Sequence, residues 1–454
     1  MSAGTGDGAG GLAERHRYAV VGTGHRAQMY VDALLGPHAD VGEIVAWCEP
    51  NPARMDFYDE LVRAAGARLP ARYAPEDLDK MVDVEQVGTV IVTSPDHTHA
   101  ELVARAMDAG ADVVLEKPLT TDLAGCRRIV DAVERTGRSL TLTFNYRYSP
   151  RNTALKEVIA SGVIGDVTSV HFEWVLDTMH GADYFRRWHR RKDLSGGLLV
   201  HKASHHFDLV NWWLADLPSR VYASGSLQFY GASNARRRGL IRRPVRGSTR
   251  TTRNDPFLLD LRDDDRLRRL YLDAEQHDGY LRDRDVFSSG ITIEDNLAVV
   301  VDYARGATLT YSLNAHSPWE GYRVSVNGTG GRAELEVVER GAVLVGKDGR
   351  VVVDPSAVAD GAAAGARPAH AERLVVQQHW GVAEEVEIPA GEGAHGGGDE
   401  RMLRDLFRGA DHDPLGRAAG LLDGVRSVVV GVAGNVSLET GLPVRTADLR
   451  LGLG

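Results

Sequence analysis

Residues 18–30 read YAVVGTGHRAQMY, and this stretch decides the fold that we expect for the first part of the chain. Residues 18–21 are an apolar run with the character of a buried parallel strand. The run ends at Gly22 and Gly24, and a segment compatible with a helix follows over residues 26–35. A strand, a glycine turn and a helix in this order predict the first unit of a parallel α/β sheet.

The small residues of this turn have the spacing of a dinucleotide-binding site. Gly22 permits the tight turn, Gly24 lets a backbone approach a phosphate, and Ala27 stands at the third small position of the pattern G-x-G-x-x-G/A. The start of the helix, at His25 and Arg26, then directs its N–H groups and positive dipole end at a pyrophosphate. An ordinary βαβ unit with a tight turn is the alternative.

A second strand-like run, residues 43–48 (EIVAWC), ends at Glu49. A carboxylate at that strand end can accept hydrogen bonds from two ribose hydroxyls and repels a 2′-phosphate, which favours NAD over NADP. The separation from Gly22 is longer than the usual ~20 residues, and we assign the difference to the loop at residues 36–40. The first strand, the glycine turn, the helix that follows it and Glu49 together predict that the domain binds NAD.

Composition limits the class of protein. A chain of 454 residues is too long for one typical domain. Its hydrophobic content of 43% and charged content of 26% are typical of a soluble globular protein, and the net charge of −10 argues against general nucleic-acid binding. Two cysteines, Cys48 and Cys126, provide neither a disulfide framework nor a thiolate metal cluster.

The N-terminal segment, residues 1–16, is rich in Gly and Ala and lacks the apolar region of a signal peptide, so we expect a disordered tail. We find no run of about 18 apolar residues in the sequence and therefore expect no membrane span. A cytoplasmic enzyme is the resulting expectation.

Three further predicted strands, at residues 88–93, 112–115 and 140–144, continue the strand–helix alternation. Each is followed by polar residues at its carboxyl end, where an open parallel sheet binds its ligand. We therefore expect one convergent site at this edge. The polar residues concerned are Ser94, Pro95, His97, Glu116, Lys117, Asn145 and Arg147.

Three stretches, VVGTGHR, TSPDHTHAELVARAMDAGADVVLEKPL and GGLLVHKASHHFDLVNWWL, resemble the Gfo/Idh/MocA oxidoreductases, the group of glucose–fructose oxidoreductase and inositol dehydrogenase. The Glu-Lys-Pro after a strand is the most specific of these features. The resemblance is close over residues 17–230, partial over 290–330 and 395–445, and absent between 231 and 285.

The resemblance implies an α/β protein with two domains. Residues 17–147 are expected to form a Rossmann domain, a doubly wound parallel sheet. Residues 148–454 are expected to form an α/β domain with a large open-faced, mainly antiparallel sheet, as the successive strands predicted after residue 290 also indicate. In the family this sheet often forms the oligomer interface, so a homo-oligomer, a dimer or tetramer, is implied.

Lys117 is the first candidate for catalysis. A lysine at a strand end beside a nicotinamide can hydrogen-bond a substrate hydroxyl and stabilise the developing alkoxide or carbonyl oxygen. The alternative is a surface lysine paired with Glu116. Because Pro118 fixes the following backbone and the family shares this motif, we assign Lys117 to catalysis and to both cofactor and substrate contact.

Residues 180–193 (HGADYFRRWHRRKD) combine aromatic, basic and imidazole side chains. Such a mixture suits a sugar ring or a phosphate, and an exposed amphipathic loop is an equal alternative. By resemblance the segment borders the active site, where we select Arg187, Trp188 and His189.

A predicted helix follows the glycine pair at residues 196–197. At 3.6 residues per turn, His201, His205 and Asp208 share one face, so that a His can relay the hydroxyl proton and Asp208 can fix its tautomer. In the family an Asp follows the glycine pair and the catalytic His stands four residues later. This chain keeps that His as His205 but has His201 at the Asp position, with Lys202 beside it.

His201 therefore either replaces the Asp as a second imidazole or indicates different chemistry. A metal site is an alternative because two His four residues apart have ligand spacing, and buried core histidines are another; we predict no metal. The residues assigned to catalysis are Lys117, His205 and His201. Those assigned to the cofactor are Gly22, Gly24, His25, Arg26, Glu49, Ser94, Pro95, His97, Glu116, Lys117, Asn145 and Trp188. Those assigned to the substrate are Lys117, Arg147, Arg187, His189, Lys202, His205 and Asp208.

Residues 231–285 form an insertion relative to the family. Eight arginines fall within residues 236–253, and acids and arginines mix in nearly equal measure after them. Such a segment is usually solvated and partly disordered. The alternative is a lid that brings an arginine to an anionic substrate group.

The sequence thus predicts an NAD-dependent oxidoreductase that moves a hydride between nicotinamide and a secondary hydroxyl of a sugar, sugar derivative or polyol. One alternative is a redox-neutral, NAD-dependent glycoside hydrolase that acts by oxidation, elimination, hydration and reduction, including on an anionic glycoside. Another is a non-catalytic NAD-binding sensor, against which the intact Glu-Lys-Pro argues.

Overall fold

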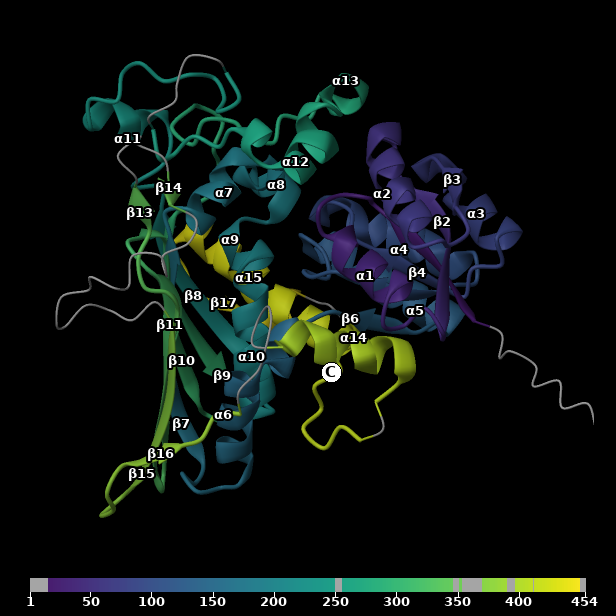
Figure 1. The fold of residues 1–454 in the computed structure, drawn as a ribbon. Helices are drawn as coiled ribbons and strands as arrows, with labels where there is room; N and C mark the ends of the chain where they lie inside the picture. The colour runs from purple at the N-terminus through teal and green to yellow at the C-terminus, as the bar shows by residue number, and fades with distance from the viewer. Residues whose placement is uncertain are drawn as a thin grey trace, which may run out of the picture.

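The computed structural model describes residues 15–249, 255–345, 351–352, 370–389, 397–410 and 412–449. It forms a parallel α/β domain followed by a second domain built on a large sheet (Figure 1). The tail expected at residues 1–14 lies outside the described residues. The first strand begins at His16, the last residue that we had assigned to that tail.

The N-terminal domain has a six-stranded parallel sheet in the order β3-β2-β1-β4-β5-β6. The chain starts in the middle of the sheet and adds strands first on one side and then on the other. The order reverses between β1 and β4, which is the topological switch point of a doubly wound fold. The strands are β1 (His16–Val21), β2 (Gly42–Cys48), β3 (Ala71–Tyr73), β4 (Thr89–Val92), β5 (Asp112–Leu115) and β6 (Leu140–Leu142).

Helices between these strands begin and end where local chemistry dictates. The Asn51 side chain accepts the N–H of Ala53 at the start of one helix, and Asp122 accepts the N–H of Gly125 at the start of another. The latter helix ends at Gly137, whose φ of +66° suits glycine. The helices are α1 (Ala27–Leu35), α2 (Pro52–Ala64), α3 (Leu78–Val84), α4 (His99–Asp108) and α5 (Leu123–Thr136).

The second domain has a nine-stranded sheet in the order β16-β15-β12-β11-β7-β10-β9-β8-β17. All neighbours pair antiparallel except β7 and β10, which run parallel. The expected fold class is confirmed. The strands are β7 (Val167–Asp177), β8 (Pro218–Ser226), β9 (Asn296–Tyr303), β10 (Thr308–Ser317), β11 (Glu320–Gly328), β12 (Gly331–Arg340), β15 (Ala371–Gln378), β16 (Glu384–Val386) and β17 (Val444–Arg445), with a separate pair, β13 (Leu344–Val345) and β14 (Val351–Val352).

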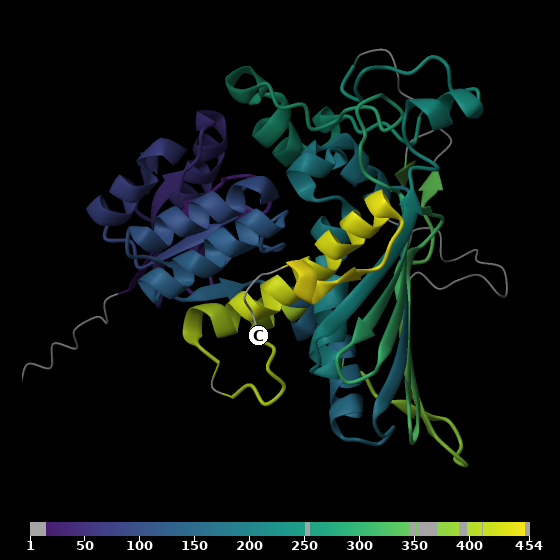
Figure 2. The same cartoon turned by 180° about the vertical axis from the view of Figure 1, so that it is seen from behind.

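One face of this sheet is covered and the other is open. Along β7, Val170, Phe172 and Trp174 point into the core, while alternate residues face outward, as the two-residue period of a strand requires. Helices α6 (Pro150–Ala160), α10 (Ser204–Leu214) and α15 (Leu421–Thr440) lie on the covered face, and α15 runs between the sheet and the N-terminal domain (Figures 1 and 2). The other face carries half-exposed Tyr222 and Val300.

Helix α15 is long and apolar enough to cross a membrane by length and composition, but most of it is buried inside the protein. Figure 2 shows it in yellow between the large sheet and the N-terminal domain. Its glycines let other elements approach closely: a Cβ at Gly431 would lie 2.5 Å from the carbonyl oxygen of Leu199. The helix is therefore a core element of this fold.

The helix predicted after residue 197 is broken in two. The chain forms α9 (Leu198–His201) and α10, with Lys202 and Ala203 between them. The Ser204 hydroxyl donates to the carbonyl oxygen of His201 at 3.4 Å, where the first helix ends. The expectation of one helix that carries all three residues is therefore wrong for His201, whereas His205 and Asp208 lie together on α10.

Residues 180–195 form three short elements, α7 (His180–Arg186), η4 (Trp188–Arg190) and α8 (Lys192–Ser195). Tyr184 and His189 are buried, so the alternative of an exposed loop does not hold.

The described part of the insertion is packed in part, although much of its arginine-rich stretch at residues 236–245 is exposed, as expected. Its charges neutralise one another internally, since the fully buried carboxylates of Asp283 and Asp285 pair with Arg246 and Arg243. Leu261 is completely buried as well. The insertion contains α11 (Ala232–Arg237), η5 (Leu261–Asp263), α12 (Asp265–Leu267), η6 (Arg268–Leu272) and α13 (Glu275–Asp278).

Candidate active site

The glycine turn after β1 is fixed by its neighbours. Gly22 has a φ of +88°, and a Cβ there would lie 2.7 Å from the backbone of Ser94, so glycine is required. The N–H of Thr23 donates to Glu49 at 2.9 Å, which ties the turn to the end of β2. Two neighbouring strand ends therefore hold the turn in place.

Glu49 is buried, and its carboxylate also accepts the N–H of Asn51 at 3.0 Å and the guanidinium of Arg54 at 3.2 Å. Arg54 in turn pairs with Asp278 of the insertion at 2.6 Å. Because two carboxylates neutralise Arg54, little positive charge remains for a 2′-phosphate. The glycine cradle and this acid fit NAD.

Glu116 lies beneath α1 and accepts hydrogen bonds from Arg26 at 2.5 Å and from the Tyr30 hydroxyl at 2.8 Å. The carboxylate is buried and pairs with this arginine across the sheet edge. Glu116 and Arg26, both assigned to the cofactor, therefore contact each other at the carboxyl ends of β5 and β1.

Lys117 follows Glu116 at the end of β5. Burial lowers the pKa of its ammonium to about 8, against the opposing charges of Asp96 and Glu116. A group with a pKa near 8 exchanges its proton close to neutral pH, as an acid–base residue must. This environment is that of a proton-transfer group rather than of a surface lysine.

Asp96 pairs with His201 across the domain boundary, with Oδ2 and Nδ1 2.5 Å apart. Both side chains are buried. Burial raises the pKa of Asp96 and lowers the pKa of His201, so the pair as a whole is neutral. The imidazole at the family's Asp position thus has a carboxylate beside it. We had not assigned Asp96 to the site, although it stands in the polar cluster after β4.

His205 lies against the ring of Tyr146, with ring centroids 4.2 Å apart and nearly parallel planes. Tyr146 comes from η3 (Asn145–Tyr148), so the junction between the domains holds this imidazole. Lys202 donates to the Tyr146 hydroxyl at 3.1 Å and lies 4.8 Å from the ring centre of Trp174. Across the described ranges, no three His, Cys, Asp or Glu side chains are grouped to hold a metal ion.

Trp188 and His189 border the same site. Their rings stack at 3.6 Å, and the His189 ring meets the His201 ring edge-on at 4.1 Å. Nδ1 of His189 is buried without a hydrogen-bond partner among the described residues. The segment at residues 180–193 thus contributes one wall, next to the Asp96–His201 pair.

Arg187 is held by a carboxylate and by the insertion. Asp183 pairs with Arg187 at 3.0 Å and with Arg282 at 2.7 Å. Although burial acts to raise it, these cations hold the pKa of Asp183 well below its usual range. Arg187 therefore lies in an ion cluster rather than standing alone as an anion-binding group.

The structure places Arg147 and Asp208 differently from our expectation. Two guanidinium nitrogens of Arg147 donate to Asp208 at 2.5 and 2.8 Å, and Arg147 also pairs with Asp423 at 2.9 Å. Asp208 thus holds a guanidinium instead of orienting the imidazole of His205, because Arg147 occupies both of its carboxylate oxygens. Asn145 similarly donates to Asp399 of α14 (Gly398–Arg408) at 2.6 Å.

The remaining assigned residues line the cofactor edge. The hydroxyls of Ser94 and Thr98 are 2.7 Å apart in the turn that contains Pro95, and the His97 ring lies 6.3 Å from Trp188. The N–H of His25 donates to Tyr271 of the insertion at 3.0 Å. This contact, between residues far apart in sequence, had no signal in the sequence.

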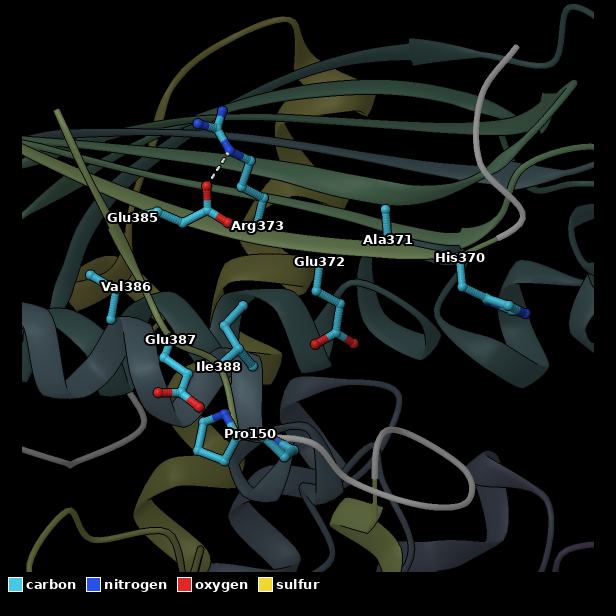
Figure 3. Close-up of a pocket in the computed structure, with 10 residues that line it drawn as sticks. Pro150, His370, Ala371, Glu372, Arg373, Glu385, Val386, Glu387 and Ile388 are labelled. Carbon is cyan, nitrogen blue, oxygen red and sulfur yellow. Dashed lines mark hydrogen bonds and ion pairs between the residues drawn. The ribbon is translucent and has the colours of Figure 1, made fainter. Parts of the chain in front are cut away.

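A groove of about 700 Å³ lies elsewhere, between β15, β16 and the start of α6 (Figure 3). Arg373 and Glu385 pair at 3.0 Å on its wall. It shares no residue with the site around Lys117, so it plays no part in the chemistry considered below.

The fold and the site define an oxidoreductase with an NAD-binding Rossmann domain. The model for the oxidoreductase family's NAD-binding Rossmann fold matches residues 16–144, and the model for its C-terminal alpha/beta domain matches residues 156–446. The chain belongs to the Gfo/Idh/MocA family, which confirms the resemblance.

Relatives in sequence span different shares of the chain. The protein called oxidoreductase YteT of Bacillus subtilis is 33% identical over 427 residues, 89% of this chain and 91% of that protein. Inositol 2-dehydrogenase of Rubrobacter xylanophilus is 29% identical over 223 residues, 47% of this chain and 57% of that protein.

Solved structures share the fold. Aldose-aldose oxidoreductase from Caulobacter crescentus, complexed with glycerol, has a TM-score of 0.61 and 17% identity and covers 95% of this chain and 100% of its own. An oxidoreductase from Agrobacterium radiobacter, in complex with NAD+, L-tartaric acid and magnesium, has a TM-score of 0.60 and 15% identity. The match covers 96% of this chain and 100% of that chain.

We predict that Arg147 stabilises the fold. R147M leaves Asp208 buried beside an uncharged side chain, so the free energy of unfolding in urea should fall by about 3–5 kcal/mol. R128M is the control, because Arg128 makes only an exposed 4.0 Å pair with Glu101 and should cost less than ~1 kcal/mol. Equal unfolding curves for R147M and the wild type would contradict a structural role.

Proposed function

We propose that the protein is an NAD-dependent dehydrogenase that oxidises a secondary hydroxyl of a sugar, sugar derivative or polyol and catalyses the reverse reduction. The observation that carries this proposal is Lys117, a partly buried lysine with a pKa lowered to about 8 at the sheet edge that also holds the glycine turn. Relatives named inositol 2-dehydrogenase support the substrate class.

Gly22, Gly24 and Glu49 are the residues that would hold the cofactor's adenosine and phosphate groups. Bound NAD supplies a hydride acceptor, and its reduced form a hydride donor. All other chemistry belongs to the chain's own side chains.

The neutral amine of Lys117 accepts the proton of the substrate hydroxyl, and the resulting ammonium remains hydrogen-bonded to the oxygen that becomes a carbonyl. His205, held flat against Tyr146, is the second group able to receive this proton. The pair of Asp96 and His201 keeps a further exchangeable proton in the same buried space.

The redox-neutral glycosidase is the second candidate. It requires a cofactor that stays bound, and the insertion's Tyr271 hydroxyl, hydrogen-bonded to the N–H of His25 at the glycine turn, favours retention. The same catalytic groups serve both reactions, since each begins with oxidation of a hydroxyl.

A buried cation supports an acidic substrate. Within the described residues Lys202 has no carboxylate within ion-pair distance, and its ammonium contacts only the Tyr146 hydroxyl and two aromatic rings. Glu320 is an opposing charge nearby, since Lys202, after His180, helps to lower its pKa, but the two make no ion pair, and a buried ammonium without an ion pair is costly. A sugar acid would supply that charge, and its oxygens would accept the remaining donors of Lys202.

The pH dependence tests Lys117. In alcohol oxidation, kcat/KM should rise as pH increases through about 8, because only the neutral amine accepts a proton; in carbonyl reduction it should fall. In K117R the guanidinium stays protonated. The change in kcat/KM near pH 8 should therefore disappear, and the rate should fall about a hundredfold. K80R, on an exposed lysine, is the control. If K117R showed the same change of kcat/KM with pH, that change would belong to a group other than Lys117.

Substrate pairs that differ only in a carboxylate test Lys202. A uronate should show a KM about tenfold below that of the matching neutral sugar, and K202M should remove this preference. K156M is the matched control, since Lys156 also lies near a ring, that of Trp212, but outside the site. Equal KM values for both substrates with the wild type would exclude an acidic substrate.

The nicotinamide content of dialysed protein separates the two candidate reactions. For a dehydrogenase, turnover of free sugars should require added NAD in proportion to product. For the glycosidase, retained NAD should support glycoside cleavage with no net reduction, measured by absorbance at the NADH band. Glycoside cleavage without added NAD would overturn the simple dehydrogenase.

A further inference from the structure

Residues 264–282 of the insertion, which we call the strap, lie across the N-terminal domain. They contain α12, η6 and α13, and Figure 1 shows these elements reaching from the second domain to the side of α2. Most of their side-chain contacts to the N-terminal domain fall at the glycine turn or near Glu49. These are the two ends of the ADP half of the dinucleotide site.

At the glycine turn the strap touches the start of α1. The Tyr271 hydroxyl accepts the N–H of His25 at 3.0 Å, and a Cβ at Gly24 would lie only 3.5 Å from that hydroxyl. Arg266 donates to Gln28, on the first turns of α1, at 2.6 Å. The first N–H groups of such a helix are those that bind a pyrophosphate, so the strap stands directly over the phosphate position.

At the ribose end the strap contacts the residues that flank Glu49. Asn51 donates to the carbonyl oxygen of Ala274 and to Asp278, each at 3.0 Å. Arg54 donates to the carbonyl oxygen of Leu270 at 3.1 Å. The Leu270 side chain is completely buried and belongs to the hydrophobic core of the N-terminal domain.

The strap is also tied back to the second domain. Arg282, at its end, makes a bidentate contact with Asp183 at 2.7 and 3.0 Å, and Arg246 pairs with Glu275 of α13. A dinucleotide under the strap can therefore leave only if these contacts, or those with α1 and α2, are broken.

We propose that the strap closes over the ADP half of bound NAD and retains the cofactor on the enzyme between turnovers. The inference rests on the NAD-binding domain and concerns retention, whichever of the two proposed reactions the site performs. The sequence alternative for the insertion was a lid that brings an arginine to an anionic substrate group, whereas the arginines of the strap contact protein groups.

The experiment measures NADH dissociation from the full-length protein by displacement with excess NAD+, followed by protein-enhanced NADH fluorescence. Two neighbouring arginines give a matched comparison. Arg269 pairs with Glu60 of α2 at 2.7 Å, whereas the ion pairs of Arg268 among the described residues are with Asp265 and Asp273, both inside the strap. The double variant R266A/R269A should dissociate NADH about tenfold faster, and R268A at the wild-type rate within about twofold.

Y271F removes only the hydroxyl at the glycine turn and should accelerate release about threefold to tenfold. The nicotinamide retained after gel filtration should fall in the same order. Wild-type dissociation rates in R266A/R269A and Y271F, or equal acceleration in R268A, would overturn the proposal. The measurement of NADH release needs no sugar substrate, so it tests the strap separately from the proposed reaction. A protein that retains NADH but oxidises no substrate would contradict the proposed function and not the proposal for the strap.

Discussion

The contact between Asp96 and His201 is the interaction on which the site depends. It joins the turn after β4 to helix α9 and so links the N-terminal domain to the second domain beside the candidate site. Because both groups are buried, the proton they hold belongs to the pair. Burial also lowers the pKa of Lys117.

Charges across the molecule are used in two ways. In the insertion and around Arg147, acids and bases neutralise each other and act as structural ties. The ammonium groups of Lys117 and Lys202, one partly buried and one buried, make no ion pair with the residues that the structure describes. A side chain whose charge is already satisfied by the protein is a poor ligand, so the second group is the region where we propose that a substrate supplies the missing partner.

The fold was largely predictable because its signals are local. Apolar runs, glycine turns and helix caps each act over a few residues, and strands such as β5 were predicted at their observed limits. The break at Lys202 was not predictable, since residues 198–214 have an uninterrupted helical pattern and tertiary packing decides where it ends. The role expected of Asp208 failed for another reason, since its partner Arg147 is 61 residues away in sequence.

Partners distant in sequence escaped prediction for a related reason. Asp96 and His201 are 105 residues apart, and Tyr271 and His25 are 246 apart, so no spacing rule connects them. The insertion was judged solvated because its charges are dense. Mutual pairing allows them to be buried, and composition alone does not reveal pairing.

Helix α15 packs against both hydrophobic cores: Val428 belongs to the core of the N-terminal domain, and Val430 to that of the second domain. The helix lies near the end of the sequence, at Leu421–Thr440. During synthesis, therefore, the N-terminal sheet leaves the ribosome long before the helix that completes its packing. Each domain must wait, with apolar surface exposed, until α15 has been synthesised, and the same helix then completes both cores.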